Sequence, residues 1–467
     1  MHSDRAKELK ERSSETRHLR VSDIFNNCGK MNTEGVFGHK TADDLFYDLL
    51  WDELLGIAAN VISPHNIKRS IRDHLLERHE WLASGSAKNS NVVVDGETFR
   101  GNKRTVGEQL SCELYQRIIH AWPHEHGTGS EKHENDKARL LLSVPEEHYY
   151  ITSIVTCGIE TRLHRVDGVE KGLTGLDKMI CELKKSIGVM ARRTIMDADY
   201  ANFNIKHTPY TMELVFKSFR KVGEKIGASS DWLWCVDWVI ESTKVRSFHF
   251  VGCLGHDARR YKALQGTFSG TRGTDIYTTI LNRAYFGVAL KVLQSQFGII
   301  PRNMYNVHQG DDIHMACDNV DAAVGVWLVL RLMGLDMQRH KQLLGAGCAE
   351  FLRTMFIGDR GLGIPARALI NLLLKPLQSS NGDDPLETVP AAFDTVQVLR
   401  RRGLSLLAYQ MVYEDQIRLC CRISLRARDY NAPTVPRCMG IGCKVGLDYH
   451  HLVIGRWTCP RPTHFRI

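Results

Sequence analysis

Apolar residues recur at helical spacing, or dominate the composition, in five segments long enough to form helices. Thr41 stands at the start of the first segment, and threonine favours the N-cap position of a helix. The pattern predicts helices at residues 41–62, 175–193, 206–226, 274–296 and 319–334.

Shorter apolar runs, bounded by glycine and acidic residues, are typical of strands. Two of these runs flank the tripeptide Gly310-Asp311-Asp312, which predicts a hairpin with an acidic turn. The runs predict strands at the start of 194–204 ("TIMDADYANFN") and in 303–309, 313–318 and 348–357, the last closed by a turn at 358–361.

Three polar stretches separate these segments. Residues 81–104 and 122–136 are rich in Gly, Ser, Asn and charge and are predicted to be loops, and 378–387 is predicted to be a linker before a final helical region. Strands and helices are mixed without a regular βαβ repeat. The pattern therefore favours an α+β fold over a doubly wound sheet.

Composition narrows the class of protein. The chain has 467 residues, 43% hydrophobic and 24% charged, which is ordinary for a globular protein of two or three lobes. No apolar stretch is long enough to cross a bilayer, and the charged start lacks the apolar segment of a secretion signal, so we expect no membrane partner. Thirteen scattered cysteines fit reduced thiols inside a cell, and a net charge of +8 is compatible with a nucleic-acid partner.

The acidic turn is the first candidate for chemistry. Adjacent carboxylates of Asp311 and Asp312 repel each other, and a bound divalent cation would relieve that repulsion. Mg²⁺ favours one or two carboxylates together with phosphate oxygens and water, so the turn is a candidate metal site for phosphoryl transfer. The simpler alternative is a solvated acidic turn.

A site for two metal ions needs a further carboxylate from elsewhere in the chain. Asp199, at the end of a predicted strand, is the first candidate and Asp197 the second. Taken alone, Asp199 is better explained as a simple helix N-cap.

Two further segments suit phosphate groups. Lys132, Lys137 and Arg139 precede an apolar run and would suit a triphosphate, although a charged loop is the usual explanation for a lone cluster of this kind. The glycine-bearing segment "FSGTRG" (268–273) leads into a predicted helix, where loop N–H groups and Arg272 could hold a phosphate. The alternative is an ordinary helix lead-in.

The order of these motifs resembles that of viral RNA-dependent RNA polymerases and is most similar to totiviruses and related double-stranded RNA viruses. The resemblance covers about residues 75–375 and implies a right-hand polymerase of fingers, palm and thumb, with an antiparallel palm sheet flanked by helices. The matching segments are "RHEWLASGS" in the fingers, "KHENDKAR" (motif F), "DYANFN" (motif A), "SGTRGTDIYTTILNRAY" (motif B), "QGDD" (motif C) and "HKQLLGAGCAEFLR" (motif D running into motif E).

The resemblance also implies domain boundaries. It places the N-terminal region and fingers in 1–195, the palm with motif A in 196–225, a fingers insertion in 226–264, the palm with motifs B to E in 265–360 and the thumb in 361–467. Polymerases of this family are usually longer, and the ending "RPTHFRI" is unlike a finished thumb, so we expect a partial or reduced chain.

Residue roles carry over position by position. Asp199 and Asp311 would be the main metal ligands with Asp312 as a weaker one, and Lys341 would protonate the leaving pyrophosphate. The residues that would bind nucleotide or template are Lys132, Lys137, Arg139, Asn204, Ser269, Gly270, Thr274, Thr278 and Asn282. The primer grip would be Glu350, Phe351, Leu352 and Arg353.

One position departs from the family. Thr278 stands where the family usually has an asparagine that helps to read the ribose 2′-hydroxyl, although threonine can also hydrogen-bond a hydroxyl. Asn282, one turn later, matches a second family position.

The function implied is RNA-directed RNA synthesis with Mg²⁺ or Mn²⁺, from nucleoside triphosphates, on an RNA template and with an RNA product. A viral coat protein is an implied partner, and the virion interior or the host cytoplasm the implied location. Two alternatives stay open: a polymerase-like RNA-binding protein without catalysis, and a reverse transcriptase. Gly310 before the two acids and the form of motif B argue against the second alternative.

The C-terminal segment carries a separate candidate. Its spacing matches no strong zinc motif, so structural thiols are the simpler interpretation. The residues that could form a zinc set are Cys438, Cys443, His450 or His451, and Cys459.

Overall fold

The computed structural model describes residues 42–82, 86–94, 97–102, 111–133, 138–250, 260–338, 340–366, 369, 397–400 and 402–412. The chain divides into two compact units, the first made of 1–132 and 139–351 and the second of 133–138 and 352–467. Thr41, Lys137, the linker 378–387 and the candidate zinc ligands lie outside the described residues.

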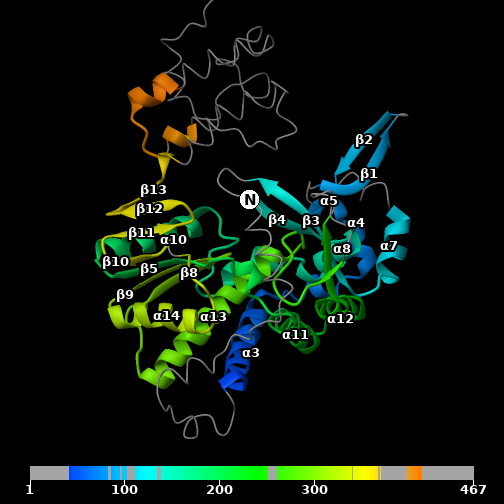
Figure 1. The fold of residues 1–467 in the computed structure, drawn as a ribbon, viewed down its shortest axis with the longest axis horizontal. Helices are drawn as coiled ribbons and strands as arrows, with labels where there is room; N and C mark the ends of the chain where they lie inside the picture. Colours follow the sequence, from blue (N-terminus) through cyan, green and yellow to red (C-terminus); the bar gives the residue numbers. More distant parts are fainter. Residues whose placement is uncertain are drawn as a thin grey trace, which may run out of the picture. The chain divides into compact units, whose positions relative to one another are not determined.

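The first unit contains a four-stranded antiparallel sheet, seen at the left of Figure 1. The strands predicted to begin at 194 and to lie in 303–309 and 313–318 are therefore confirmed. The hairpin predicted around Gly310-Asp311-Asp312 is confirmed as well. In this sheet Asp199 lies directly opposite Asp312. The strands, in sheet order, are β10 (Leu343–Gly345), β5 (Thr194–Asp199), β9 (Asp312–Cys317) and β8 (Tyr305–Gln309).

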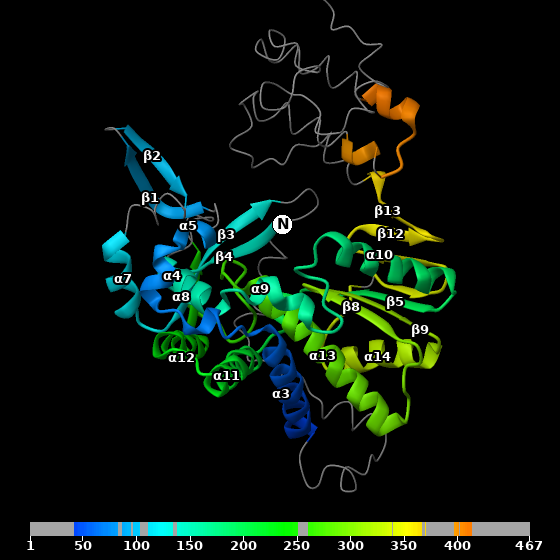
Figure 2. The same cartoon turned by 180° about the vertical axis from the view of Figure 1, so that it is seen from behind.

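Helices cover both faces of this sheet (Figures 1 and 2). On one face, α13 (Thr274–Phe297) and α14 (Val320–Leu332) pack on alternate apolar residues of the strands such as Met196. On the other face, α10 (Gly175–Met190) approaches closely because Gly188 has no side chain: a Cβ there would lie 3.1 Å from Ala316. All three helices were predicted from the sequence.

The second sheet of this unit has the strand order β4-β3-β6-β7, with β3 parallel to β6 and β6 antiparallel to β7. A small apolar cluster on this sheet contains Leu142, Phe248, Ala263 and Phe268. The strands are β3 (Glu125–His133), β4 (Ala138–Ser143), β6 (Arg246–Phe250) and β7 (Tyr261–Lys262).

The predicted loops at 81–104 and 122–136 are wrong. The first contains the antiparallel hairpin β1 (Ser86–Val94) and β2 (Glu97–Asn102), and the second contains β3. β3 lies between β4 and β6 and forms backbone hydrogen bonds with both, and β6 lies far away in the sequence. The polar composition of these segments indicated loops, but pairing with another strand provides hydrogen-bond partners for their backbone N–H and C=O groups.

A group of helices completes the unit. The predicted helices at 41–62 and 206–226 are confirmed as α3 (Ala42–Val61) and α11 (Pro209–Lys225). Thr208 caps α11 by accepting from Thr211 N–H, with Pro209 at the first helical position. The further elements are η2 (Asn66–Lys68), α4 (Ile71–Leu76), α5 (Arg78–Trp81), α7 (Ser111–Ile119), α8 (Glu146–Thr156), α9 (Ile159–Arg162), η3 (Leu163–Arg165), η4 (Phe203–Ile205) and α12 (Ser230–Lys244).

The single strand predicted over 348–357 is wrong, because the chain forms two strands there. β11 (Cys348–Phe351) ends the first unit, and β12 (Thr354–Ile357) pairs with β13 (Arg360–Gly363) in the second. Leu352 and Arg353 interrupt the run with positive φ angles of 49° and 65°, a conformation that no strand contains.

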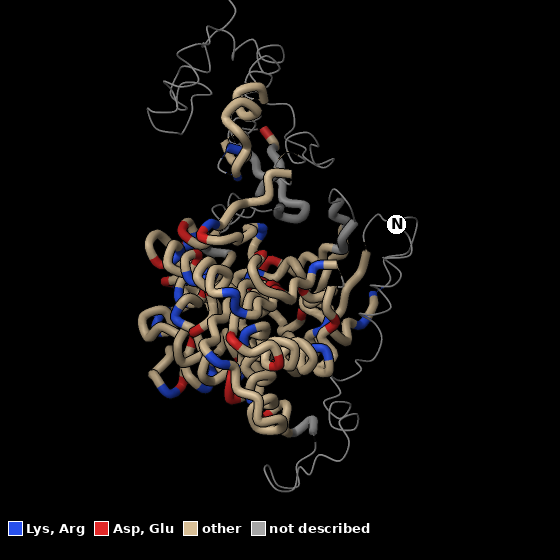
Figure 3. Tube along the Cα trace, turned by 90° about the vertical axis from the view of Figure 1, so that its left-hand side faces the viewer, with Lys and Arg blue, Asp and Glu red and all other residues tan. Residues whose placement is uncertain are grey.

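Figure 3 shows how charge is distributed over the described residues: Lys and Arg lie among Asp and Glu along this part of the trace and are not gathered in one block. None of the helices in the described part of the chain has the length and apolar composition that a membrane crossing requires.

Candidate active site

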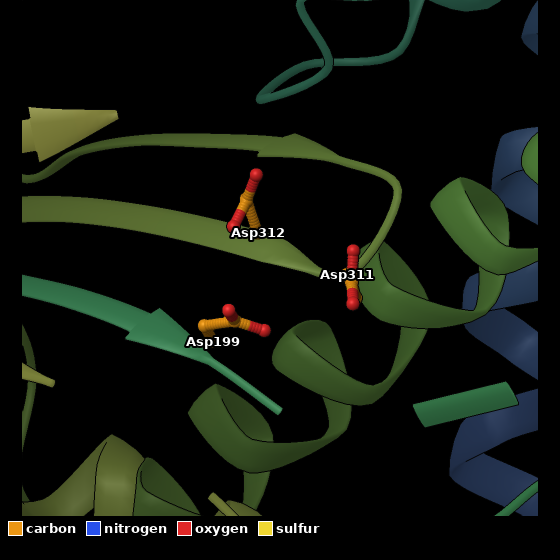
Figure 4. Close-up of side chains that lie close together, drawn as sticks. All are labelled: Asp199, Asp311 and Asp312. Atoms are coloured by element: carbon orange, nitrogen blue, oxygen red, sulfur yellow. The ribbon is translucent and has the colours of Figure 1, made fainter. Parts of the chain in front are cut away.

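Three carboxylates from two distant parts of the sequence meet at one edge of the antiparallel sheet (Figure 4). Asp199 ends β5, Asp312 begins β9 opposite it, and Asp311 lies in the turn between β8 and β9. One oxygen from each of these side chains lies within 4.8 Å of the others. The structure thus brings together all three residues predicted to bind metal.

The turn that carries Asp311 is fixed by α13. Gly310 has a φ of +59°, which suits the first position of a tight two-residue hairpin turn. Its N–H donates to Thr279 Oγ1 at 2.9 Å, and its carbonyl accepts from Asn282 Nδ2 at 3.0 Å. Asn282 Nδ2 also donates to the carbonyl of Asp312 at 3.1 Å. Two buried helix residues therefore hold the backbone on both sides of Asp311.

The same asparagine links the turn to β5. Tyr200 is the residue after Asp199, and its hydroxyl donates to Asn282 Oδ1 at 3.2 Å. Burial raises the pKa of Tyr200 well above its usual value, so the hydroxyl keeps its proton and stays a donor. Asn282 thereby fixes the two acidic segments relative to each other.

The carboxylates of the site repel one another. Burial, followed by the charges of Asp311 and Asp199, raises the pKa of Asp312 to about 7, while the Lys341 ammonium opposes this shift. A carboxyl with a raised pKa among other acids is a group that a divalent cation would stabilise in its ionised form.

Asp197, the second choice for a metal ligand, lies away from the three acids. It is buried two residues before Asp199, and its carboxylate is 2.6 Å from His314 Nδ1. The same carboxylate accepts from Glu350 N–H at 2.6 Å. Asp197 therefore joins β5 to β9 and β11.

Lys341 lies beside the metal-ligand candidates. Its Nζ is 2.5 Å from Asp199 Oδ2, and its side chain is 56% exposed, so it can also reach a ligand in the site. The segment before Lys341 is hydrogen-bonded to the chain at the end of β5. Ala201 N–H donates to the carbonyl of Asp336 at 2.7 Å, and Gln338 N–H donates to the carbonyl of Asp199 at 2.8 Å.

The loop before α13 joins the two sheets. Thr267 N–H donates to the carbonyl of Asn204 at 2.7 Å, and the Asn204 side chain is exposed. Gly270 N–H donates to Leu142 O at 2.9 Å, and the Ser269 hydroxyl accepts from Leu142 N–H. A Cβ on Gly270 would lie 2.7 Å from that Leu142 oxygen, so this approach requires glycine.

The other predicted nucleotide-binding residues occupy different settings. Thr274 is the first residue of α13 and donates to Phe268 O at 2.8 Å. Thr278 is buried and donates to the carbonyl of Thr274 within the helix. Lys132 and Arg139 belong to β3 and β4, but their side chains lie outside the described part of the structure.

The predicted primer-grip residues surround the end of β11. Phe351 is buried, and the Lys185 ammonium lies 4.8 Å from the centre of its ring. Glu350 is anchored through its backbone to Asp197, and Leu352 and Arg353 follow in the turn with positive φ. Their contact with a primer stays a prediction.

Two residues of α13 near the acidic turn, Thr279 and Asp275, were not predicted from the sequence. Thr279 was not singled out, because a threonine beside Thr278 in a helix carries no distinct signal. Asp275, at the start of α13, pairs with Lys171, and its Oδ1 would lie 3.7 Å from a Cβ on Gly310. Lys171 also lies 3.2 Å from Glu160. Nothing local in the sequence relates these residues to the turn.

The sequence is similar to those of known viral polymerases. A family model described as viral RNA-directed RNA-polymerase matches residues 5–372. The chain is 29% identical over 227 residues to the RNA-directed RNA polymerase of Penicillium chrysogenum virus (isolate Caston/2003), covering 48% of this chain and 19% of that relative. It is 26% identical over 319 residues to the probable RNA-directed RNA polymerase of Helminthosporium victoriae virus-190S, covering 65% of this chain and 35% of the relative.

The fold is also similar to a solved structure. The crystal structure of the insertion loop deletion mutant of the RNA-dependent RNA polymerase of a human picorbirnavirus matches with a TM-score of 0.50 and 13% identity, over 91% of this chain and 90% of that one. The expected α+β polymerase fold is thereby confirmed. From the extent of the family match, the chain belongs to the family of viral RNA-directed RNA polymerases.

Proposed function

We propose that this chain catalyses template-directed addition of ribonucleotides to an RNA 3′-hydroxyl. The observation that carries the proposal is the convergence of Asp199, Asp311 and Asp312, whose ligand oxygens lie within 4.8 Å of one another. The chain spans 19% and 35% of the two relatives described above, so activity, substrates and partners are inferred from this site and from family membership.

The donor set suits Mg²⁺ or Mn²⁺. Three carboxylates offer hard oxygen ligands. Burial and then the charges of Asp311 and Asp199 raise the pKa of Asp312, and a cation would neutralise that negative charge. A pair of these ions, when bound, would activate the attacking hydroxyl and stabilise charge on the leaving pyrophosphate.

The remaining chemistry comes from side chains around the triad. The exposed Lys341 ammonium beside Asp199 suits a proton donor to the leaving pyrophosphate. The loop at Ser269 and Gly270 would contact the nucleotide and template, with the exposed Asn204 near the ribose. Lys132, Lys137 and Arg139 would bind the triphosphate. Because Thr278 donates within its helix, we assign ribose recognition chiefly to the surroundings of Asn204.

The partners follow from the reaction. RNA serves as template and product, and nucleoside triphosphates are the substrates. The resemblance to polymerases of double-stranded RNA viruses supports a coat protein as a partner and the virion interior or the host cytoplasm as the location. The division into fingers, palm and thumb at the boundaries given above belongs to the same proposal.

Incorporation of labelled ribonucleotides on a defined RNA template tests the proposal. We expect synthesis that depends on the template and on Mg²⁺ or Mn²⁺, and its loss in Asp311→Asn with folding retained. Asp177→Asn, the same change at an exposed position of α10, is the matched control and should keep wild-type activity. Equal activity in Asp311→Asn and the control would refute the assignment.

The same assay separates the alternatives. A reverse transcriptase would prefer deoxynucleotides on the RNA template. An RNA-binding protein without catalysis would bind the template in a salt-dependent manner but incorporate nothing at any metal concentration.

A further inference from the structure

The side-chain amide of Gln342 forms hydrogen bonds to three separate parts of the first unit. Its Nε2 donates to the carbonyl of Asp199 at 2.7 Å and to the carbonyl of Gln338 at 3.0 Å. Its Oε1 accepts from Trp327 Nε1 at 3.3 Å. The amide thus joins the end of β5, the segment before Lys341 and helix α14.

The position of Gln342 gives these bonds a direct effect on the site. Lys341 is the preceding residue, and its Nζ is 2.5 Å from Asp199 Oδ2. The following residue, Leu343, starts β10 and lies opposite Asp197 in the sheet register. The backbone at Lys341 is therefore held on both sides. Gln342 fixes it on one side, and on the other the carbonyl of Gln338 accepts from Lys341 N–H at 3.0 Å.

Trp327 fixes the orientation of the amide. Its ring is half-buried against the core, and the guanidinium of Arg331 stacks over it at 4.6 Å from the ring centre. Because the indole N–H can only donate, it requires an oxygen opposite it, and both Nε2 hydrogens of Gln342 then point toward the carbonyls of Asp199 and Gln338.

We propose that Gln342 is a positioning residue for the Lys341–Asp199 pair. Its role is to hold the backbone of the metal ligand and of the proton donor at one relative placement. This proposal rests on the proposed polymerase function. A misplacement of about 1 Å in such a site can cost about 10²-fold in rate.

Gln342→Glu tests this role with almost no change in shape. It keeps the acceptor for Trp327 but replaces both donors by an oxygen that faces two carbonyls. We expect kcat to fall about 10²-fold while KM for the nucleotide changes less than about threefold. Trp327→Phe removes the orienting donor together with part of the ring that packs against the core, and it should give a smaller loss. Gln116→Glu, the same change at an exposed position of α7, is the control and should leave both constants unchanged.

A double-variant cycle separates positioning from general support of the fold. In the wild-type chain, Lys341→Leu should cost about 10²-fold in kcat. In the Gln342→Glu background it should cost less than about threefold, because residues that act as a unit have non-additive effects. Losses that multiply, or a kcat for Gln342→Glu equal to that of the control, would overturn the proposal.

Hydrogen–deuterium exchange provides a readout that does not require activity. Peptides covering residues 335–345 should exchange faster in Gln342→Glu and Trp327→Phe than in wild type and Gln116→Glu. Unchanged exchange would overturn the positioning role. If wild-type protein incorporates no nucleotide, the polymerase proposal fails; faster exchange in Gln342→Glu would then show only that Gln342 holds the backbone of Asp199 and Lys341.

Discussion

Asn282 donates its side-chain amide to the carbonyl of Gly310 at 3.0 Å, across the interface between α13 and the acidic turn. The same amide group binds the carbonyl of Asp312 and the hydroxyl of Tyr200, so one buried residue connects both segments that carry the acids. The geometry of the metal-ligand candidates therefore depends on a residue of a different motif.

Replacing this asparagine should loosen the site. Asn282→Leu removes a hydrogen-bond partner from each of three groups, and we expect the free energy of unfolding to fall by about 2–4 kcal/mol. Thr279→Val, of nearly equal size, removes the partner of Gly310 N–H and the bond that the Thr279 hydroxyl donates to the carbonyl of Asp275, and it should cost about 1–3 kcal/mol. Urea unfolding measures both. If Asn282→Leu is no less stable than Thr279→Val, the amide does not fix the turn.

Lys341 should act on the rate more than on binding. Because its ammonium lies beside Asp199 and stays accessible, Lys341→Leu should lower kcat about 10²-fold with a smaller change in KM for the nucleotide. Lys244→Leu, at an exposed position of α12, is the control. Steady-state incorporation kinetics measure both constants, and an unchanged rate in Lys341→Leu would remove the proton-donor role.

The raised pKa of Asp312 predicts a pH dependence of metal binding. The value of about 7 means that the metal-free site holds a proton on this carboxyl below neutral pH, and a cation must displace it. Affinity for Mn²⁺ should therefore weaken as pH falls below about 7, as calorimetric titration at several pH values would measure. A constant affinity between pH 6 and pH 8 would contradict the prediction.

The same carboxyl should affect stability without metal. Its pKa in the folded chain lies above the ordinary value of 3.8, so the folded state binds the proton more tightly than the unfolded state. Between about pH 4 and pH 7, its contribution to the free energy of unfolding is therefore lost as pH rises. Asp312→Asn should remove this dependence, and thermal unfolding across that range would detect it.

A buried ion pair should hold the loop before α13. Arg246 on β6 pairs with Glu125 on β3, donates to the carbonyl of Gly266 at 2.6 Å and stacks over the ring of Phe268. Arg246→Met leaves the Glu125 charge buried without this partner, and such a change costs about 3–5 kcal/mol of stability.

A more exposed pair provides the comparison for Arg246. Arg220 pairs with Asp237 where both side chains are partly exposed, so Arg220→Met should cost less than about 1 kcal/mol. Urea unfolding of both variants measures the difference. Equal losses would show that the buried pair contributes no more than the surface pair.

Local sequence patterns were sufficient to predict the helices around the site, the acidic hairpin and the order of the motifs. Helical periodicity predicted α3, α10, α11, α13 and α14, and the glycine before two acids predicted the hairpin that carries Asp311. These features depend on local spacing and turn chemistry, which a single stretch of sequence contains.

Which acids lie together depends on how the strands pair in the folded chain. Asp197 and Asp199 lie on the same side of β5, and the sheet register alone places Asp199 opposite Asp312 and Asp197 opposite His314. Register, the pairing of β3 with β6, and the bonds from Asn282 and Gln342 join residues far apart in the chain. The free energy of such contacts exists only once the chain has folded, so no local pattern of residues could reveal them.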